Sequence, residues 1–247
     1  MATLLNEKMV KGGEFLIKET APEDVFIPEE WNEEQKMIGQ SCSDFIDTEI
    51  FPYLDKIDSL EYPELIPSLL EKTGQLGVLG SSVPEEYGGL GMDFNTSMLI
   101  AERFGKSHSF VVSFLAHSGI GTLPILFFGT EEQKARYLPK LVTGESKAAY
   151  CLTEPDAGSD ANAGKTKAVL SADKKNYLLN GQKMWITNAG FADLFIVFAK
   201  IDNDKYLSAF IVEKDFGGIT MNEEEKKLGI KGSSTRQVFF NDCKIPV

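Results

Sequence analysis

Residues 148–187 read AAYCLTEPDAGSDANAGKTKAVLSADKKNYLLNGQKMWIT, and this stretch decides the fold class. Short runs rich in β-branched and aromatic residues are separated by Gly, Pro, Asn, Asp and Ser, a pattern typical of strands joined by turns. Upstream of residue 145 the apolar residues recur with the period of a helix instead. The sequence therefore predicts an α+β protein, with a helical part followed by a β part.

The β part is predicted to be a small antiparallel barrel. Asn180-Gly181 is the dipeptide of a two-residue hairpin because both residues tolerate positive φ, and Asn203-Asp204 lies where a second turn is needed. Seven short strands with turns between them favour a compact antiparallel barrel or sandwich. The predicted strands are 148–153, 166–170, 177–179, 183–187, 194–199, 207–212 and 238–240.

The earlier residues predict a helical domain. Asn32 followed by Gln35, and Thr130 followed by Gln133, match the pattern in which two side chains cap the start of a helix. Residues 110–128 are mostly apolar but contain glycines and a proline, which predicts two short buried helices.

Three segments are expected along the chain: an arm with little helix over residues 1–30, a helical domain over 31–145 and a β-barrel domain over 146–247. The chain stops at Val247, directly after a predicted strand and without a closing helix. We therefore expect it to be a fragment of a longer protein.

Composition excludes several classes of protein. The hydrophobic fraction of 43% is that of a folded domain. The net charge of −12 opposes nucleic-acid binding, which needs clustered cations. The three cysteines are far apart and lack a C-x-x-C pair, so no metal site is expected, and free thiols favour a cytoplasmic location. No apolar run predicts a transmembrane segment, and the N-terminus does not resemble a signal peptide.

The densest group of polar residues is Tyr150–Asp160, where a strand ends and a loop begins. Its hydroxyls and free backbone amides suit an anion or the polar edge of a heterocycle, although an ordinary acidic surface turn explains the composition as well. Trp185 and Thr187 then place an aromatic plate beside a hydroxyl on one face of a strand. Packing in the core is the alternative explanation for Trp185.

Two other motifs give little support for a binding or catalytic site. Residues 88–91 are rich in glycine but follow no strand, so a dinucleotide-binding turn is not supported. His117 precedes Ser118 without a G-x-S-x-G elbow, which favours a hydrogen-bonded core histidine over a catalytic triad.

Several segments, in order and spacing, resemble the acyl-CoA dehydrogenase family. The residues 31–35 and 216–220 look most like its very-long-chain branch. The segments that carry the resemblance are Glu85–Gly91, Gly129–Leu138, Tyr150–Asp160, Asn180–Asn188 and Lys227–Phe240.

This resemblance implies a fold and a cofactor. The family has an N-terminal helical domain, a middle β-barrel and a C-terminal helical bundle, and we expect only the first two here. FAD would lie between barrel and bundle, and Ser159 would also face the CoA portion of the substrate. The residues implied at the flavin are Tyr150, Cys151, Leu152, Thr153, Glu154, Pro155, Asp156, Ala157, Gly158, Ser159, Trp185, Ile186 and Thr187.

The resemblance also implies a reaction, the α,β-dehydrogenation of a fatty acyl-CoA thioester, and its very-long-chain branch implies a long acyl chain. The base is a glutamate on the bundle, so no catalytic residue is expected within these 247 residues, and the fragment alone should be inactive. The implied electron acceptor is an electron-transfer flavoprotein, and the full-length protein is expected to be a homo-oligomer. An acyl-CoA oxidase and a non-catalytic assembly protein built on the same fold remain alternatives.

Overall fold

The computed structural model describes Val10 and residues 12–247. The chain divides into two compact units, Met1–Ser41 and Cys42–Val247. In the first, the described part of the predicted arm contains only single turns of 3-10 helix; residues 1–9 and 11 of that arm lie outside the described residues.

Helix α1 (Glu33–Phe45) begins where the sequence predicts, because Asn32 and Gln35 cap it reciprocally. The Asn32 amide donates to the Gln35 side chain at 3.0 Å, and the Gln35 amide donates to the Asn32 side chain at 2.8 Å. These bonds satisfy amides that a helix leaves free in its first turn.

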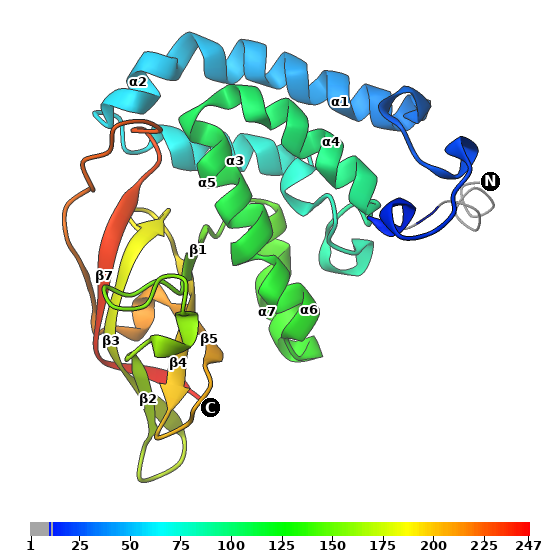
Figure 1. Cartoon of the computed structure of the whole chain (residues 1–247). Helices are drawn as coiled ribbons and strands as arrows, with labels where there is room; N and C mark the ends of the chain where they lie inside the picture. Colours follow the sequence, from blue (N-terminus) through cyan, green and yellow to red (C-terminus); the bar gives the residue numbers. More distant parts are fainter. Residues whose placement is uncertain (1–9, 11) are drawn as a thin grey trace. The chain divides into compact units, whose positions relative to one another are not determined.

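Before the sheet, the described residues of the second unit form helices joined by irregular connectors, and no strand, as predicted (Figure 1). Thr130 and Gln133 form the predicted capping box at the last helix, with bonds of 2.9 and 3.2 Å. The helices are α2 (Leu54–Ser59), α3 (Leu65–Gln75), α4 (Phe94–Phe104), α5 (Ser109–Leu115), α6 (Leu123–Phe128) and α7 (Glu131–Val142).

Helices α5 and α6 are joined by the π-helical turn Ala116–Gly121 into one helical run, Ser109–Phe128. By length and composition alone this run is apolar enough to cross a membrane. Phe110, Phe114 and Ile125 on it are nevertheless buried inside the protein. Leu115, Ile120, Phe127 and Phe128 on the same run are exposed, so the prediction of two buried helices holds only in part.

The strands form one curled, mixed sheet among the described residues, which corrects the prediction of a wholly antiparallel barrel. Both β1 and β2 pair in parallel with β4, while the other pairs are antiparallel. Parallel pairing needs a long connection, and more than 40 residues separate β1 from β4. The strands are β1 (Ala148–Cys151), β2 (Lys167–Leu170), β3 (Asn176–Thr187), β4 (Leu194–Ile201), β5 (Ser208–Glu213), β6 (Ile219–Met221) and β7 (Thr235–Pro246).

The hairpin predicted at Asn180-Gly181 is wrong, because β3 runs straight through it. Its antiparallel partner β7 carries an extra residue opposite this point, so the dipeptide sits at a β-bulge. Asn180 exchanges hydrogen bonds of 2.9 Å with Asp242 across the bulge. A Cβ at position 181 would lie 2.4 Å from the Thr166 hydroxyl, so glycine is required by close approach and not by a turn.

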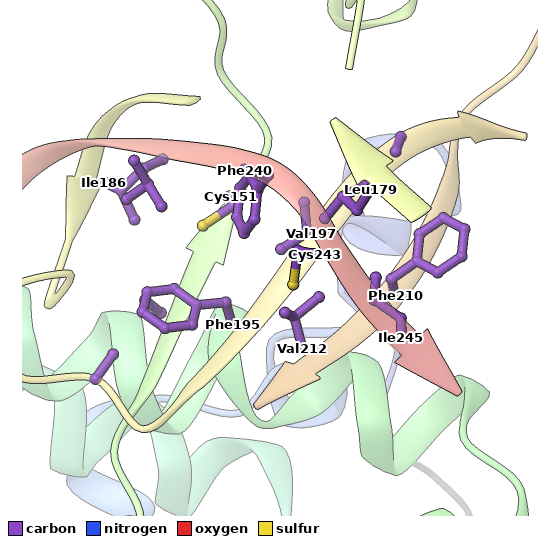
Figure 2. Packing of buried hydrophobic residues seen from close by; sticks show 14 of the residues in the cluster. Cys151, Leu179, Ile186, Phe195, Val197, Phe210, Val212, Phe240, Cys243 and Ile245 are labelled. Atoms are coloured by element: carbon purple, nitrogen blue, oxygen red, sulfur yellow. The ribbon is translucent and has the colours of Figure 1, made fainter. Parts of the chain in front are cut away.

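A hydrophobic core lies inside the curled sheet (Figure 2). Phe195, Val197 and Phe240 are buried there, and the thiols of Cys151 and Cys243 point into the same cluster. Burial raises the pKa of the Cys151 thiol to about 12. Both sulfurs therefore serve as small apolar groups, in keeping with the expectation of free thiols.

Two buried polar side chains connect the helices to the sheet. His117 accepts a hydrogen bond from the Ala148 amide at 3.0 Å through Nδ1, and its Nε2 donates to the Leu141 carbonyl at 2.9 Å. Asn188 donates to the carbonyls of Ser113 and Ala148 at 3.0 and 3.2 Å. The predicted hydrogen-bonded core histidine is therefore confirmed.

Candidate functional site

The loop after β1, residues 152–166, connects two strands, β1 and β2, that pair with successive parts of the same strand, β4. Strand β1 ends opposite Val197 of β4, and β2 begins opposite Lys200 of the same strand. Residues 152–166 leave and return within this short gap, so the two ends of the loop are held close together. The sheet thus presents the polar loop that the sequence singled out at one defined place.

The part of β3 that carries Trp185 lies against the start of this loop. The Met184 amide donates to the Thr153 carbonyl at 2.8 Å, which joins the start of the loop directly to the residue before Trp185. The two segments singled out in the sequence therefore meet, although about 30 residues separate them along the chain.

A second bulge turns Trp185 outward. Four residues of β3, from Lys183 to Ile186, face three residues of β7, from Val238 to Arg236, and Trp185 adopts a φ of 58°. The extra residue moves the following side chain to the opposite face. As a result Ile186 is 2% exposed in the core, whereas the Trp185 side chain is 61% exposed. Core packing, the alternative explanation for this tryptophan, is excluded.

Three hydroxyl groups lie near this indole in the chain pairing, one on β3 itself and two on the loop that β3 contacts. Thr153 and Thr187 are half-buried, and Ser159 is exposed. Within residues 10 and 12–247, no protein group hydrogen-bonds these three side-chain hydroxyls. Gly158 leaves open space where a side chain would stand. An aromatic plate on one strand and free hydroxyls on the adjoining loop suit a flat, polar-edged heterocycle.

Some of the other predicted site residues do not present a free side chain at this surface. Cys151 and Ala157 are buried, so only their backbone groups are available to a ligand. Tyr150 packs its ring on Phe198 at a centroid distance of 5.1 Å, and burial raises the pKa of its phenol. Of the remaining loop residues, Pro155 and Asp156 are exposed.

A buried ion pair supports the loop from beneath. The Lys183 ammonium lies 2.7 Å from the Glu154 carboxylate, and their side chains are 0% and 5% exposed. Burial lowers the pKa of Lys183, with Glu154 opposing the shift. Burial acts to raise the pKa of Glu154, but hydrogen bonds from Lys183 and Thr166 hold it below its usual value.

Sequence reasoning assigned no role to Lys183, because strict alternation along residues 183–187 places it on the same face as Trp185, and only the bulge separates the two. A lysine at an inward position of an alternating strand needs a buried carboxylate partner, since an isolated buried ammonium is costly. Glu154 lies at the end of another predicted strand and supplies that carboxylate.

The helical part and the curled sheet define an α+β body with one aromatic, polar-edged site. The chain matches the acyl-CoA dehydrogenase N-terminal domain over residues 32–145 and the acyl-CoA dehydrogenase middle domain over 149–243. The protein therefore belongs to the acyl-CoA dehydrogenase family.

Individual relatives agree with this assignment. A probable acyl-CoA dehydrogenase of Bacillus subtilis is 51% identical over 96% of this chain and 39% of its own length. The human very long-chain specific acyl-CoA dehydrogenase is 44% identical over 77% of this chain and 30% of its own. A crystal structure of a Bacillus anthracis acyl-CoA dehydrogenase complexed with FAD superposes with a TM-score of 0.92 at 52% identity, covering 96% of this chain and 40% of that one.

The chain thus spans about two fifths or less of the length of these relatives. They share its helical and β parts, the parts that hold the loop and the tryptophan strand.

Proposed function

We propose that this protein contributes the flavin-facing half of an FAD-dependent acyl-CoA dehydrogenase, which converts fatty acyl-CoA thioesters to trans-2-enoyl-CoA. One observation carries the proposal: the Met184–Thr153 hydrogen bond brings the loop hydroxyls and the exposed Trp185 to one place. The relative solved in complex with FAD supports the choice of cofactor.

The residues present fit the cofactor. Trp185 would lie against the isoalloxazine ring, while the Thr153 and Thr187 hydroxyls would donate to its polar edge. Both hydroxyls lack a partner among the described residues, so neither would give up a protein hydrogen bond. Bound FAD supplies a hydride acceptor, a chemistry that protein side chains lack.

The residues of this chain would bind and orient the cofactor and the substrate, and would not take the substrate proton. Ser159 is exposed at the rim of the loop and would contact the CoA portion of the substrate. Glu154 is committed to Lys183 and to the loop amides, so it is a poor candidate for a base. The resemblance assigns proton removal to a glutamate of the family's C-terminal bundle. We propose an electron-transfer flavoprotein as the acceptor and a homo-oligomeric state for the full-length protein.

The first test measures FAD binding by fluorescence titration. Trp185→Ala is expected to weaken binding at least tenfold, because loss of an aromatic contact and its buried area removes roughly 1.4 kcal/mol or more. The exposed position of Trp185 should leave the fold intact. Trp31→Ala, which changes the only other tryptophan of the sequence, should bind FAD like the parent. Equal affinity in the parent and Trp185→Ala would contradict the proposed flavin contact.

Activity is tested on the protein joined to a C-terminal bundle of the family. We expect acyl-CoA-dependent reduction of an artificial dye under anaerobic conditions, with little peroxide formed in air. Rapid peroxide formation in air would instead indicate an acyl-CoA oxidase. FAD binding without any turnover would indicate an assembly protein that retains the dehydrogenase fold.

We further propose a preference for long acyl chains. A Cβ at Gly119 would meet no atom within 4 Å, which leaves room beside the helical run Ser109–Phe128. Gly121 offers no such space, since a Cβ there would lie 2.7 Å from that of Ala148. Binding of C8, C12 and C16 acyl-CoA to the bundle-containing protein should be tightest at C16, and tightest binding at C8 would refute the preference.

A further inference from the structure

We propose that the buried Lys183–Glu154 ion pair is a positioning device for the candidate flavin site, which sets the spacing between Thr153 and Trp185. Only the identity of the ligand in this inference rests on the proposed function. The geometry of the loop and strand stands independently of it.

The ammonium group holds the loop on both sides of Thr153. Lys183 Nζ donates to the Leu152 carbonyl at 3.1 Å and to the Glu154 carboxylate at 2.7 Å. Residues 152 and 154 flank Thr153 directly, so one buried cation fixes the backbone that carries the Thr153 hydroxyl. The Met184 amide adds a third bond, to the carbonyl of Thr153 itself.

The carboxylate ties the two ends of the loop together. Glu154 accepts hydrogen bonds from the Lys165 amide at 2.5 Å and from the Thr166 amide at 3.1 Å. The outgoing and returning arms of residues 152–166 therefore share one acceptor. Within the loop, the amides and carbonyls of Glu154 and Ala157 exchange two further bonds of 3.1 Å.

Within β3, Lys183 is the last residue that pairs regularly with β7 before the bulge that exposes Trp185. The same residue therefore fixes the loop and begins the distortion that aims the indole. A movement of Lys183 along β3 would shift Thr153 and Trp185 together, whereas loss of its bonds would let them move apart.

The energetics favour a role in geometry over one in stability. Burying two opposite charges costs desolvation that their attraction only partly offsets, and well-packed apolar residues often stabilise a fold equally well. Hydrophobic contacts are non-directional, whereas each of the hydrogen bonds made by this pair requires a particular distance and angle. The pair thus selects one loop position among the many that apolar packing would allow.

The test uses the double variant Lys183→Met/Glu154→Gln of the whole chain. Methionine retains the length of the lysine stem without the charge, and glutamine keeps an acceptor for the amides at 165 and 166. The matched control is Lys140→Met/Glu145→Gln, which removes an ion pair of 3.1 Å outside the loop, where both side chains are at least 60% exposed.

Two readouts are compared: hydrogen exchange of individual amides by NMR, and FAD affinity. In the double variant we expect exchange at Glu154, Ala157 and Met184 to accelerate at least tenfold, while amides of β4 keep their parental rates. FAD affinity should fall at least tenfold. The control should match the parent in both measurements.

Unchanged exchange at Met184 in the double variant would overturn the proposal. Equal acceleration throughout β4 would also overturn it, because that result assigns the pair to global stability. If neither the parent nor the control binds FAD, the proposed function is contradicted, while the exchange rates still decide whether the pair positions the loop.

Discussion

Replacing Glu154 with leucine is expected to lower the free energy of unfolding by about 3–5 kcal/mol, because it leaves a buried ammonium without its counter-charge. Lys183 would retain only the Leu152 carbonyl as a partner in a fully buried position. Urea denaturation followed by circular dichroism measures this loss. Adding Lys183→Met to Glu154→Leu should restore most of it, since the second change removes the stranded charge.

This single variant should also gain stability as the pH rises. In Glu154→Leu, burial without a carboxylate depresses the pKa of Lys183 further below its unfolded value, so between these two pKa values the unfolded chain binds more protons than the folded one. Stability is then recovered as the pH increases toward the unfolded pKa of about 10.4. Asp156→Leu, which breaks the exposed pair with Lys165, should change stability by less than about 1 kcal/mol. A Glu154→Leu variant as stable as Asp156→Leu would contradict the prediction.

The second large effect is a loss of about 3 kcal/mol of stability as the pH falls from above 6.5 to about 4. Its source is His117, whose pKa is lowered from 6.5 to about 4, chiefly by burial. The Leu141 carbonyl and Asp193 act to raise this pKa, and Lys147 acts to lower it. Because the unfolded chain binds the proton more readily, the stabilisation is complete above pH 6.5 and disappears as the pH approaches 4.

Chemical denaturation at a series of pH values between 4.5 and 7 measures the slope of the free energy of unfolding against pH. His117→Gln should flatten it, because the glutamine amide offers a donor and an acceptor but does not titrate in this range. His108→Asn, at the exposed histidine, should retain the parental slope. The same slope in His117→Gln and the parent would show that other groups are responsible.

Local patterns predicted the elements well. Thr130 and Gln133, or Asn32 and Gln35, are sufficient to start a helix because the bonds lie within four residues. The change of hydrophobic period near residue 145 likewise marked the change from helix to sheet. Such signals depend only on neighbours in the chain.

Pairings between distant segments were not predictable in the same way. Parallel pairing of β1 with β4 leaves no local mark. Asn180-Gly181 serves a bulge opposite β7 as well as it would serve a turn, because both require an unusual backbone or close approach. The resemblance located the site loop and Trp185, but the outward direction of the indole arises from an extra residue relative to β7. The role of Lys183 likewise became visible only with Glu154 beside it.

The hydrogen bonds of His117 and Asn188 have a consequence for protein engineering. The His117–Ala148 bond joins residues 32–145, which match the first family domain, to the first residue of β1, and the Asn188–Ser113 bond joins them to residues 149–243, which match the second. A chimera that grafts the β part of a relative onto these helices would preserve its covalent joint yet could strand buried amides and carbonyls on both sides. Recombination at this junction should succeed only when His117 and Asn188 are combined with acceptors and donors that match them.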